Sequence, residues 1–290
     1  MADLQLNGQT RVAGVIGWPV RHSLSPPMHN AAFAALGLNW VYVPFAVHPD
    51  RIACAIQAVR ALDLGGLNVT IPHKLAVLPY LDEISEEART LGAANTIVNL
   101  EGHLVGYNTD GEGFLRSLRE IGEDVTGRSV ALIGAGGSAR SIALAVSRAG
   151  ASHLSIINRT VEKAQALVEM VRGALPEAQV AAVALDAPGA AAAVREARVV
   201  IDSTAVGMHP NHEVEPVIPP QWLHAEQTVC DLTYNPRVTV LLKAAAARGS
   251  RTLDGTGMLV HQGALAFEYW TGQPVPIEAM RDALLRSLEP

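Results

Sequence analysis

The chain has 290 residues, of which 49% are hydrophobic and 17% charged, and its formal net charge at pH 7 is −6. A single core rarely extends over this length, so two domains are expected. The negative net charge and the lack of a basic stripe argue against a protein that binds nucleic acid. No apolar run reaches the roughly 18–20 residues of a membrane span, and the N-terminus lacks a secretory signal pattern. We therefore expect a cytoplasmic protein without a membrane anchor.

The cysteines and histidines indicate neither disulfides nor a metal site. Cys54 and Cys230 stand in apolar surroundings without C-x-x-C partners, which predicts two reduced thiols in the core. The ten histidines are scattered, with no H-E-x-x-H or other paired spacing, so no bound metal is expected.

Strand-like and helix-like segments alternate in the first third of the chain. Apolar and β-branched runs predict strands at residues 12–16, 40–47 and 66–70. Helical spacing of apolar residues predicts helices at residues 28–36 and 51–62. Residues 95–99 and 103–107 flank Glu101 and Gly102, which is typical of a β-hairpin.

From about Ser129 the alternation of strands and helices becomes more regular. Strands are predicted at residues 130–133, 154–157, 180–184, 198–201 and 228–232, with a helix at 138–149. The Ala-rich segment 187–193 is expected to begin a helix, and the tail from about Leu259 contains two helical patterns. Short apolar strands that alternate with helices predict an α/β protein with a parallel sheet covered on both faces.

A glycine-rich loop follows the strand at 130–133 and opens the next helix. It fits the pattern G-x-G-x-x-A and consists of Gly134, Ala135, Gly136, Gly137, Ser138 and Ala139. In a dinucleotide-binding loop, the first glycine permits a tight turn and the second lets the backbone approach the pyrophosphate. The last small residue keeps the helix close to the sheet, and the helix N-terminus attracts phosphate. A glycine turn without a ligand is the alternative, but the strand–loop–helix context favours a dinucleotide.

The end of the second strand of this unit favours NADP(H) over NAD(H). An NAD enzyme usually has an acidic residue there to bind the ribose 2′-hydroxyl. This chain instead has Asn158, Arg159 and Thr160, with Lys163 one turn later. An arginine can hold a 2′-phosphate through two hydrogen bonds, whereas a carboxylate would repel it. The alternative is a solvated arginine in a capped turn.

Six further segments resemble the sequence signatures of the shikimate dehydrogenase family, in the family's order. They are GWPVRHSLSPPMHN (17–30), NVTIPHK (68–74), GAANT (92–96), GYNTDG (106–111), DLTYNP (231–236) and DGTGMLVHQ (254–262). The resemblance implies an enzyme that reversibly reduces 3-dehydroshikimate to shikimate with NADPH, in the biosynthesis of chorismate and the aromatic amino acids.

The resemblance also implies a domain organisation. An N-terminal α/β substrate-binding domain would comprise residues 1–110 and 243–290, because the C-terminal helices return to it. Residues 111–242 would form a Rossmann-type NADP-binding domain between these two segments.

By the same resemblance, Lys74 and Asp110 form the catalytic pair. A lysine suits the reaction because its ammonium group can stabilise the negative charge that develops on a carbonyl oxygen and then donate the proton. Asp110 would orient Lys74. Taken singly, Lys74 could instead be a surface lysine after a turn, and Asp110 a helix cap.

The resemblance assigns further residues to the two ligands. Those expected to bind substrate are Ser23, Ser25, Thr70, Asn95, Tyr234 and Gln262. Ser23 and Ser25 would hold the carboxylate, although both could instead cap the following helix. Thr204, in a segment expected near the nicotinamide ribose, and Gly255 and Met258 are also expected to bind the cofactor. Asp202 and Ala205 depart from the family's commoner Asn-Ala-Thr-Pro opening, so the resemblance does not fix the local backbone there.

Two other functions compete with this interpretation. The first is a quinate/shikimate dehydrogenase with broader substrate or cofactor use, whose additional substrate, quinate, has one more ring hydroxyl. An NAD-preferring form of this enzyme predicts an acidic residue in place of Arg159. A non-catalytic NADPH-binding regulator predicts loss of Lys74 or Asp110, and both are present. We expect a monomer or homodimer that binds small molecules.

Overall fold

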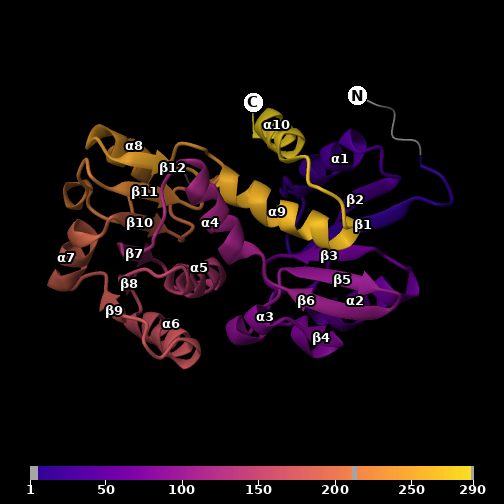
Figure 1. Ribbon diagram of the computed structural model, residues 1–290, viewed down its shortest axis with the longest axis horizontal. Helices are drawn as coiled ribbons and strands as arrows, with labels where there is room; N and C mark the ends of the chain where they lie inside the picture. The colour runs from indigo at the N-terminus through magenta and orange to yellow at the C-terminus, as the bar shows by residue number, and fades with distance from the viewer. Residues whose placement is uncertain (1–5, 211–213, 289–290) are drawn as a thin grey trace. The chain divides into compact units, whose positions relative to one another are not determined.

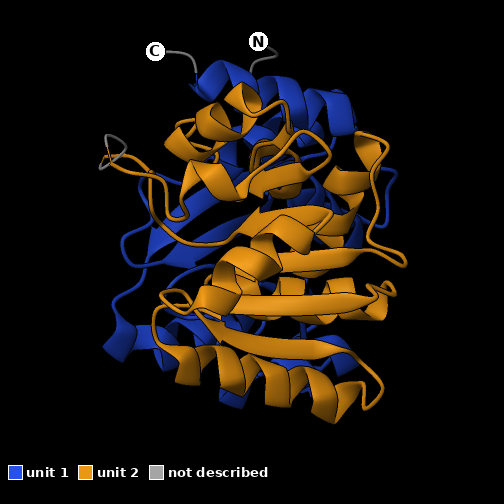
Figure 2. Cartoon of the chain, turned by 90° about the vertical axis from the view of Figure 1, so that its left-hand side faces the viewer, with its two compact units in different colours: residues 1–109, 260–290 blue, residues 110–259 orange. Residues whose placement is uncertain are grey.

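The computed structural model describes residues 6–210 and 214–288 and divides the chain into two compact units (Figure 1). The first unit contains residues 1–109 and 260–290, and the second contains residues 110–259 (Figure 2). The chain thus leaves the first unit once and returns to it near its C-terminus.

The first unit is built on a mixed sheet with the strand order β2-β1-β3-β5-β6-β4. The strands are β1 (Arg11–Gly17), β2 (Trp40–Ala46), β3 (Gly66–Val69), β4 (Glu83–Ile84), β5 (Thr96–Leu100) and β6 (His103–Tyr107). Both β2 and β3 pair with β1 in parallel. The predicted hairpin is present as β5 and β6, and β5 runs antiparallel to β3.

One face of this sheet is covered by α2 (Ile52–Ala61) and α3 (Glu86–Leu91). Ile52, Ile56 and Val59 recur at helical spacing, so one side of α2 is buried against the strands. Cys54 lies on the opposite side of α2 and is exposed. The prediction that both thiols are buried is therefore wrong for Cys54 and confirmed for Cys230.

The C-terminal helices pack in the first unit. They are α9 (Thr256–Thr271), whose residues from Val260 onward belong to this unit, and α10 (Ile277–Leu288), which packs against α1 (Ser25–Ala35). Trp270 donates a hydrogen bond of 2.9 Å from its indole Nε1 to the Ile97 carbonyl of β5. This bond fixes the end of α9 on the sheet, because both groups are buried.

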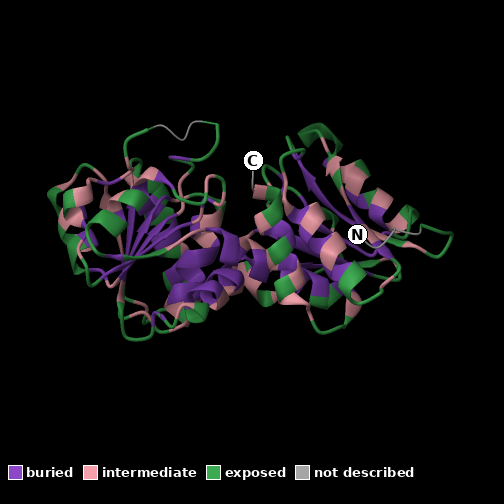
Figure 3. Cartoon of the chain, turned by 90° about the horizontal axis from the view of Figure 1, so that it is seen from above, coloured by how far each residue is buried: buried purple, intermediate pink, exposed green. Residues whose placement is uncertain are grey.

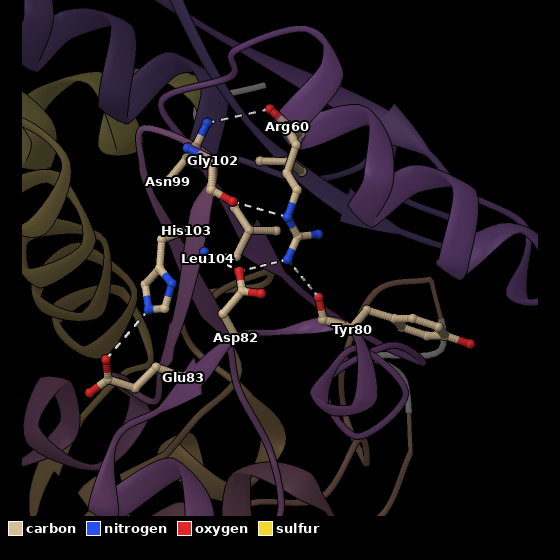
Figure 4. Close-up of polar contacts among 9 residues, drawn as sticks. Arg60, Tyr80, Asp82, Glu83, Asn99, Gly102, His103 and Leu104 are labelled. Atoms are coloured by element: carbon tan, nitrogen blue, oxygen red, sulfur yellow. Dashed lines mark hydrogen bonds and ion pairs between the residues drawn. The ribbon is translucent and has the colours of Figure 1, made fainter.

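Polar contacts join α2 to the far edge of the sheet (Figure 4). The Arg60 guanidinium donates to Asp82 Oδ2 at 2.7 Å and to the carbonyl oxygens of Gly102 and Tyr80 at 3.0 and 3.3 Å. The Leu104 amide also donates to Asp82 Oδ2, at 2.7 Å. The Leu104 amide and then the Arg60 guanidinium hold the pKa of Asp82 below its usual value. The side chain of Arg60 thereby connects a helix, a hairpin and the segment before β4.

The second unit contains a six-stranded sheet with the order β12-β11-β10-β7-β8-β9. The strands are β7 (Ser129–Ile133), β8 (His153–Asn158), β9 (Val180–Ala184), β10 (Val199–Asp202), β11 (Thr228–Asp231) and β12 (Arg251–Leu253). Every strand pair described in this sheet is parallel. The order is that of a doubly wound dinucleotide-binding fold, in which ligands bind beyond the carboxyl ends of the strands.

Helices cover both faces of this sheet. One face packs against α4 (Asp110–Glu120), α5 (Gly137–Arg148) and α6 (Val161–Ala174), and the other against α7 (Pro188–Glu196) and α8 (Val240–Ala247). In each unit the central strands are largely buried, whereas the helices have buried and exposed sides (Figure 3). Among the described residues, no helix combines the length and the apolar character needed to cross a membrane.

The structure differs from the expected domain boundaries at the second crossing. Residues 243–259 were assigned to the substrate-binding domain, but they belong to the second unit. The physical reason is that α8 buries Leu242 and Ala245 in the core of this unit, and β12 pairs with β11. The chain crosses instead within α9, which begins at Thr256 rather than near Leu259.

We predict that Gly66→Ala destabilises the protein by about 1–3 kcal/mol, as overpacking of a core does. A Cβ atom at Gly66 would overlap Trp270 Nε1 and lie 2.5 Å from the Ile97 carbonyl oxygen. The free energy of unfolding, measured in urea, checks this. Gly173→Ala in α6 is the control, because its Cβ meets nothing within 4 Å. That variant should be unchanged or slightly more stable, and equal stabilities of the two variants would contradict the account.

Candidate active site and cofactor pocket

A pocket of about 710 Å³ lies at the carboxyl ends of β7, β8 and β10 in the second unit. Eight of the residues predicted to bind cofactor line it: Gly134, Ala135, Gly136, Asn158, Arg159, Thr160, Lys163 and Thr204. The parallel register aligns the ends of the strands at one edge, because Ile133 pairs with Ile157 and with Asp202. Loops that are far apart in the sequence therefore form one pocket.

The glycine loop has the geometry that its sequence predicted. Gly134 has a φ angle of +103°, and a Cβ atom there would lie 2.5 Å from Ser203 Oγ. A larger residue would fit neither the backbone nor the space. Gly136 is the N-cap residue of α5 and has no side chain to cap the first turn, so backbone N–H groups remain for a ligand. Gly137, Ser138 and Ala139 form that first turn, and Ala139 is fully buried.

The turn after β8 presents two cations to the pocket. Arg159 and Lys163 are both exposed, and neither forms an ion pair with another described residue. The Asn158 side-chain amide donates to the Thr160 carbonyl at 2.8 Å and shapes the turn. Thr160 is the N-cap residue of α6, but its hydroxyl makes no cap bond. The turn can therefore receive a phosphate without breaking an existing ion pair.

One charged residue of the pocket was missed by sequence reasoning. Glu215 lines the same pocket as Arg159 and Lys163, although it stands far away in the sequence and in no motif. Only the course of the loop after β10 brings it there. No local sequence signal could have indicated this position.

The wall of the pocket at residues 203–206 is held by Asp202. The Thr204 amide donates to Asp202 Oδ1 at 2.8 Å, and the Val206 amide donates to Thr204 Oγ1 at 3.2 Å. Ser203 Oγ donates to the Ile133 carbonyl at 2.7 Å. Burial, and then the nearby charge of Asp231, raise the pKa of Asp202 to about 7. The local backbone that the sequence left open is thus a turn closed by the Asp202 carboxyl group.

Gly255 and Met258 do not line this pocket. Gly255 packs directly against the backbone of Leu232 and Thr233, and its amide donates to the Thr233 carbonyl at 3.0 Å. Met258 is 9% exposed and belongs to the core of the second unit. Their assignment to the cofactor stays a prediction.

In the first unit, the structure brings together residues from two of the quoted motifs. Thr70 follows β3, and its amide donates to the Ile16 carbonyl at 2.9 Å. Lys74 is half-buried in the next turn, and its carbonyl accepts from the Ala94 amide at 2.8 Å. Asn95 follows at once and is buried. The backbone of Lys74 is therefore fixed beside the segment that carries Asn95.

Asn95 fixes the chain immediately before Asp110. Its Oδ1 accepts from the Thr109 amide at 2.9 Å, and its Nδ2 donates to Thr109 Oγ1 at 2.9 Å. Asn108 Nδ2 donates to the Ala93 carbonyl at 3.0 Å, which holds the same turn. Asp110 is 5% exposed and is the first residue of α4. Asn95 thus acts as a structural anchor, in addition to any bond to a ligand.

The predicted carboxylate-binding serines lie at the start of α1. Ser25 is buried and Ser23 is half-buried, and Ser23 Oγ accepts from the Ser25 amide at 3.3 Å. Ser25 lies close to Tyr42, whose hydroxyl donates to Asn68 Oδ1 at 2.7 Å. Tyr42 and Asn68 were not predicted as site residues. Tyr42 looks like an ordinary strand residue in the sequence.

Gln262 and Tyr234 belong to different units. Gln262 is half-buried on α9, next to Gly263, whose Cα faces Met28 and His29 of α1. Tyr234 follows β11 in the second unit, and burial raises the pKa of its hydroxyl. Their roles toward substrate stay predictions.

Comparisons with known proteins agree with the sequence signatures. Residues 15–97 match the shikimate dehydrogenase substrate binding domain, and residues 116–237 match shikimate / quinate 5-dehydrogenase. Residues 255–285 match the shikimate 5′-dehydrogenase C-terminal domain. A relative from Desulforamulus reducens, named shikimate dehydrogenase (NADP(+)), is 46% identical over 98% of both chains. The chain belongs to the shikimate dehydrogenase family.

Solved structures show the same relationship. A shikimate dehydrogenase in complex with NADP⁺ superposes with a TM-score of 0.92 at 42% identity, over 99% of this chain and 98% of that one. The shikimate 5-dehydrogenase of Thermus thermophilus, in complex with NADP(H) and shikimate, gives a TM-score of 0.86 at 35% identity, covering 96% and 100%. The predicted fold class, with a substrate domain and a Rossmann-type domain, is confirmed. So is the prediction of an NADP-dependent oxidoreductase of this family.

We predict that Asn95→Ala lowers the free energy of unfolding by about 2 kcal/mol, because it leaves buried partners on Thr109 without hydrogen bonds. Denaturation in urea measures the difference. Asn39→Ala is the matched control, since Asn39 also bonds to two side chains, Thr10 and Asn7, but is exposed. Its effect should stay within about 0.5 kcal/mol. If Asn95→Ala also lowered the free energy of unfolding by no more than about 0.5 kcal/mol, the anchoring role would be contradicted.

Proposed function

We propose that Lys74 and Asp110 are the catalytic pair of this enzyme and that the pocket at residues 134–136 and 158–163 binds NADP(H). The reaction is the reversible NADPH-dependent reduction of 3-dehydroshikimate to shikimate, in the biosynthesis of the aromatic amino acids. The observation that carries the cofactor site is the pairing of a glycine loop with Arg159 and Lys163 in one pocket.

The pocket residues fit a dinucleotide with a 2′-phosphate. The N-terminus of α5 and the close backbone approach at Gly134 suit the pyrophosphate. Arg159 and Lys163 suit the 2′-phosphate, since neither carries another described ion pair and no carboxylate ends β8. When bound, NADPH supplies a hydride to the carbonyl carbon of the substrate.

Lys74 acts on the oxygen of that carbonyl group. As the carbon–oxygen double bond is reduced, an electron pair moves onto the oxygen, and the ammonium group of Lys74 stabilises the charge. The Nζ atom then gives its proton to the oxygen, which forms the hydroxyl group and leaves a neutral amine. In the oxidation direction the amine takes the proton back. Asp110 orients the amine, and Asn95 with Thr109 holds the backbone that precedes Asp110.

The remaining predicted residues recognise the substrate. Ser23 and Ser25 offer hydroxyl donors for the carboxylate, and Tyr42, which donates to Asn68, lies close to Ser25. Thr70, Asn95 and Gln262 are assigned to ring hydroxyls, and Tyr234 to the carboxylate. We further propose that the protein works in the cytoplasm as a monomer or homodimer, without nucleic acid or membrane partners.

Quinate is the second candidate substrate, because one of the matching families covers both shikimate and quinate enzymes. Steady-state assays with shikimate and quinate, each with NADP⁺ and NAD⁺, test both. We expect the highest kcat/KM with shikimate and NADP⁺. Absence of shikimate oxidation with either cofactor would refute the proposed reaction, and equal kcat/KM for quinate would establish the broader enzyme.

We predict that Lys74→Ala lowers kcat about 100-fold or more while KM for shikimate changes only a few-fold, because the charge that Lys74 meets develops in the transition state. Initial rates over a range of shikimate concentrations separate the two constants. Lys243→Ala, which removes an exposed lysine of α8, is the control and should leave both unchanged. Near-normal kcat in Lys74→Ala would remove Lys74 from the mechanism.

We predict that Arg159→Ala raises KM for NADP⁺ about 10- to 100-fold, the effect of losing a charge-assisted hydrogen bond to phosphate, and leaves KM for NAD⁺ nearly unchanged. Coenzyme titrations at saturating shikimate measure both constants. Arg195→Ala removes an exposed arginine on α7 and should change neither. Equal increases for NADP⁺ and NAD⁺ in Arg159→Ala would show that Arg159 does not select the 2′-phosphate.

A further inference from the structure

Two buried carboxyl groups lie at the ends of neighbouring strands, and one of them directly precedes the pocket wall at residues 203–206. Asp202 ends β10 and Asp231 ends β11; they are register partners, and each is 1% exposed. Strand side chains alternate between the two faces of a sheet, and Val200 and Val229 belong to the core on the α7–α8 face. The two carboxyl groups therefore project to the same face, side by side.

The hydrogen bonds of these carboxyl groups come from neutral donors. Asp202 Oδ1 accepts from the Thr204 amide at 2.8 Å. Asp231 accepts from the Thr233 amide at 2.9 Å and from Thr239 Oγ1 at 2.6 Å. No described residue forms an ion pair with either carboxyl group. The negative charges of the two groups would therefore be compensated only partly if both were ionised.

The elements packed around Asp202 supply no positive side chain to it within the part of the chain that the structure describes. On its other side, β7 presents Ile133 as the register partner. From α8, Leu241 and Leu242 are buried, whereas Lys243 is exposed to solvent. Asp254, beyond β12, adds a negative charge that acts on Asp231 and is itself paired with Arg237 at 3.0 Å. Asp202 thus faces one carboxyl group and apolar side chains.

Asp202 is connected directly to the cofactor pocket. It closes the turn at Thr204, whose hydroxyl accepts from the Val206 amide, and residues 203–206 line the pocket. Ser203 and Thr204 also lie against Gly134, where even a Cβ atom would not fit. A small displacement of the turn would therefore change the space in front of the glycine loop.

We propose that Asp202 is a positioning residue for cofactor binding: its carboxyl group closes the turn that forms the pocket wall, and its ionisation beside Asp231 adds a negative charge that weakens binding of NADP(H). This inference rests on the cofactor site proposed above.

The protonation behaviour of Asp202 supports the proposal. Burial, followed by the charge of Asp231, raises its pKa to about 7, so the charge state changes near neutral pH. A ligand with several negative phosphate charges favours the neutral form of a nearby carboxyl group. By linkage, the neutral form of Asp202 then favours the ligand, so affinity falls as the pH rises through about 7.

The test is the dissociation constant of NADPH, measured by fluorescence titration between about pH 6 and pH 8.5. The 2′-phosphate of the ligand also titrates near pH 6, so each variant is compared with the natural chain at the same pH. Relative to Asp202→Asn, the natural chain should lose about threefold in affinity across this range, which corresponds to a half-unit change in the pKa of Asp202 on binding. Asp231→Asn should also reduce this loss, because it removes the repulsion.

Glu215→Gln is the matched control. It removes another carboxylate of the pocket, but one that is exposed and lies outside the turn at residues 203–206. It should change affinity by a similar factor at every pH and keep the pH dependence of the natural chain. The same pH dependence in Asp202→Asn and the natural chain would overturn the proposal. Unchanged NADPH affinity in Arg159→Ala would instead refute the cofactor site itself, so the two failures are distinguishable.

Thermal unfolding separates positioning from a purely structural role. The pKa of Asp202 is raised by folding from 3.8 to about 7, so its contribution to stability is complete below about pH 4 and is lost as the pH rises through about 7. The melting temperature of Asp202→Asn should therefore rise relative to the natural chain as the pH increases. A change in melting temperature without a change in the pH dependence of NADPH binding would overturn the positioning role. If Asp202→Asn fails to fold, Asp231→Asn serves for both measurements.

Discussion

The parallel register of β7, β8 and β10 is the constraint on which the proposed cofactor pocket depends. It ends the three strands at one edge, so that the glycine loop, the Arg159 turn and the Asp202 turn meet there. Helices with apolar sides cover both faces of the sheet and hold the strands in this register, since the strands are buried on both sides. Gly134 then lets the glycine loop and the Asp202 turn approach closely, because a Cβ atom at residue 134 would lie only 2.5 Å from Ser203 Oγ.

The sequence predicted those parts of the molecule in which local chemistry decides the structure. The glycine loop and Arg159 were found because a strand, a turn and a helix start are all encoded within a few residues. The pairing of β5 with β6 followed from two β-rich runs around a short turn. The family and its reaction were inferred from six long motifs that occur in the family's order along the chain. No single helix or strand would have indicated them.

Features that depend on tertiary neighbours were not predictable in this way. β12 has three residues and is a strand only because β11 lies beside it, so the second domain boundary was placed too early. The exposure of Cys54 depends on which side of α2 faces the sheet. Glu215 and Tyr42 enter their sites through the course of a loop and the pairing of a strand. The role proposed for Asp202 depends on Asp231, which follows it by a whole strand-to-strand connection and becomes its neighbour only through the sheet register.

The return of α9 to the first unit has a consequence for the order of folding. The Trp270 indole and the Ile97 carbonyl that it bonds are 173 residues apart in sequence, and the whole second unit lies between them. During synthesis, the first 109 residues leave the ribosome long before the C-terminal helices that pack against their sheet and α1. The second unit has all its strands in one continuous segment, so it can fold as a local unit while the first still waits for its last two helices. The unit that begins the chain is thus the one that must be completed last.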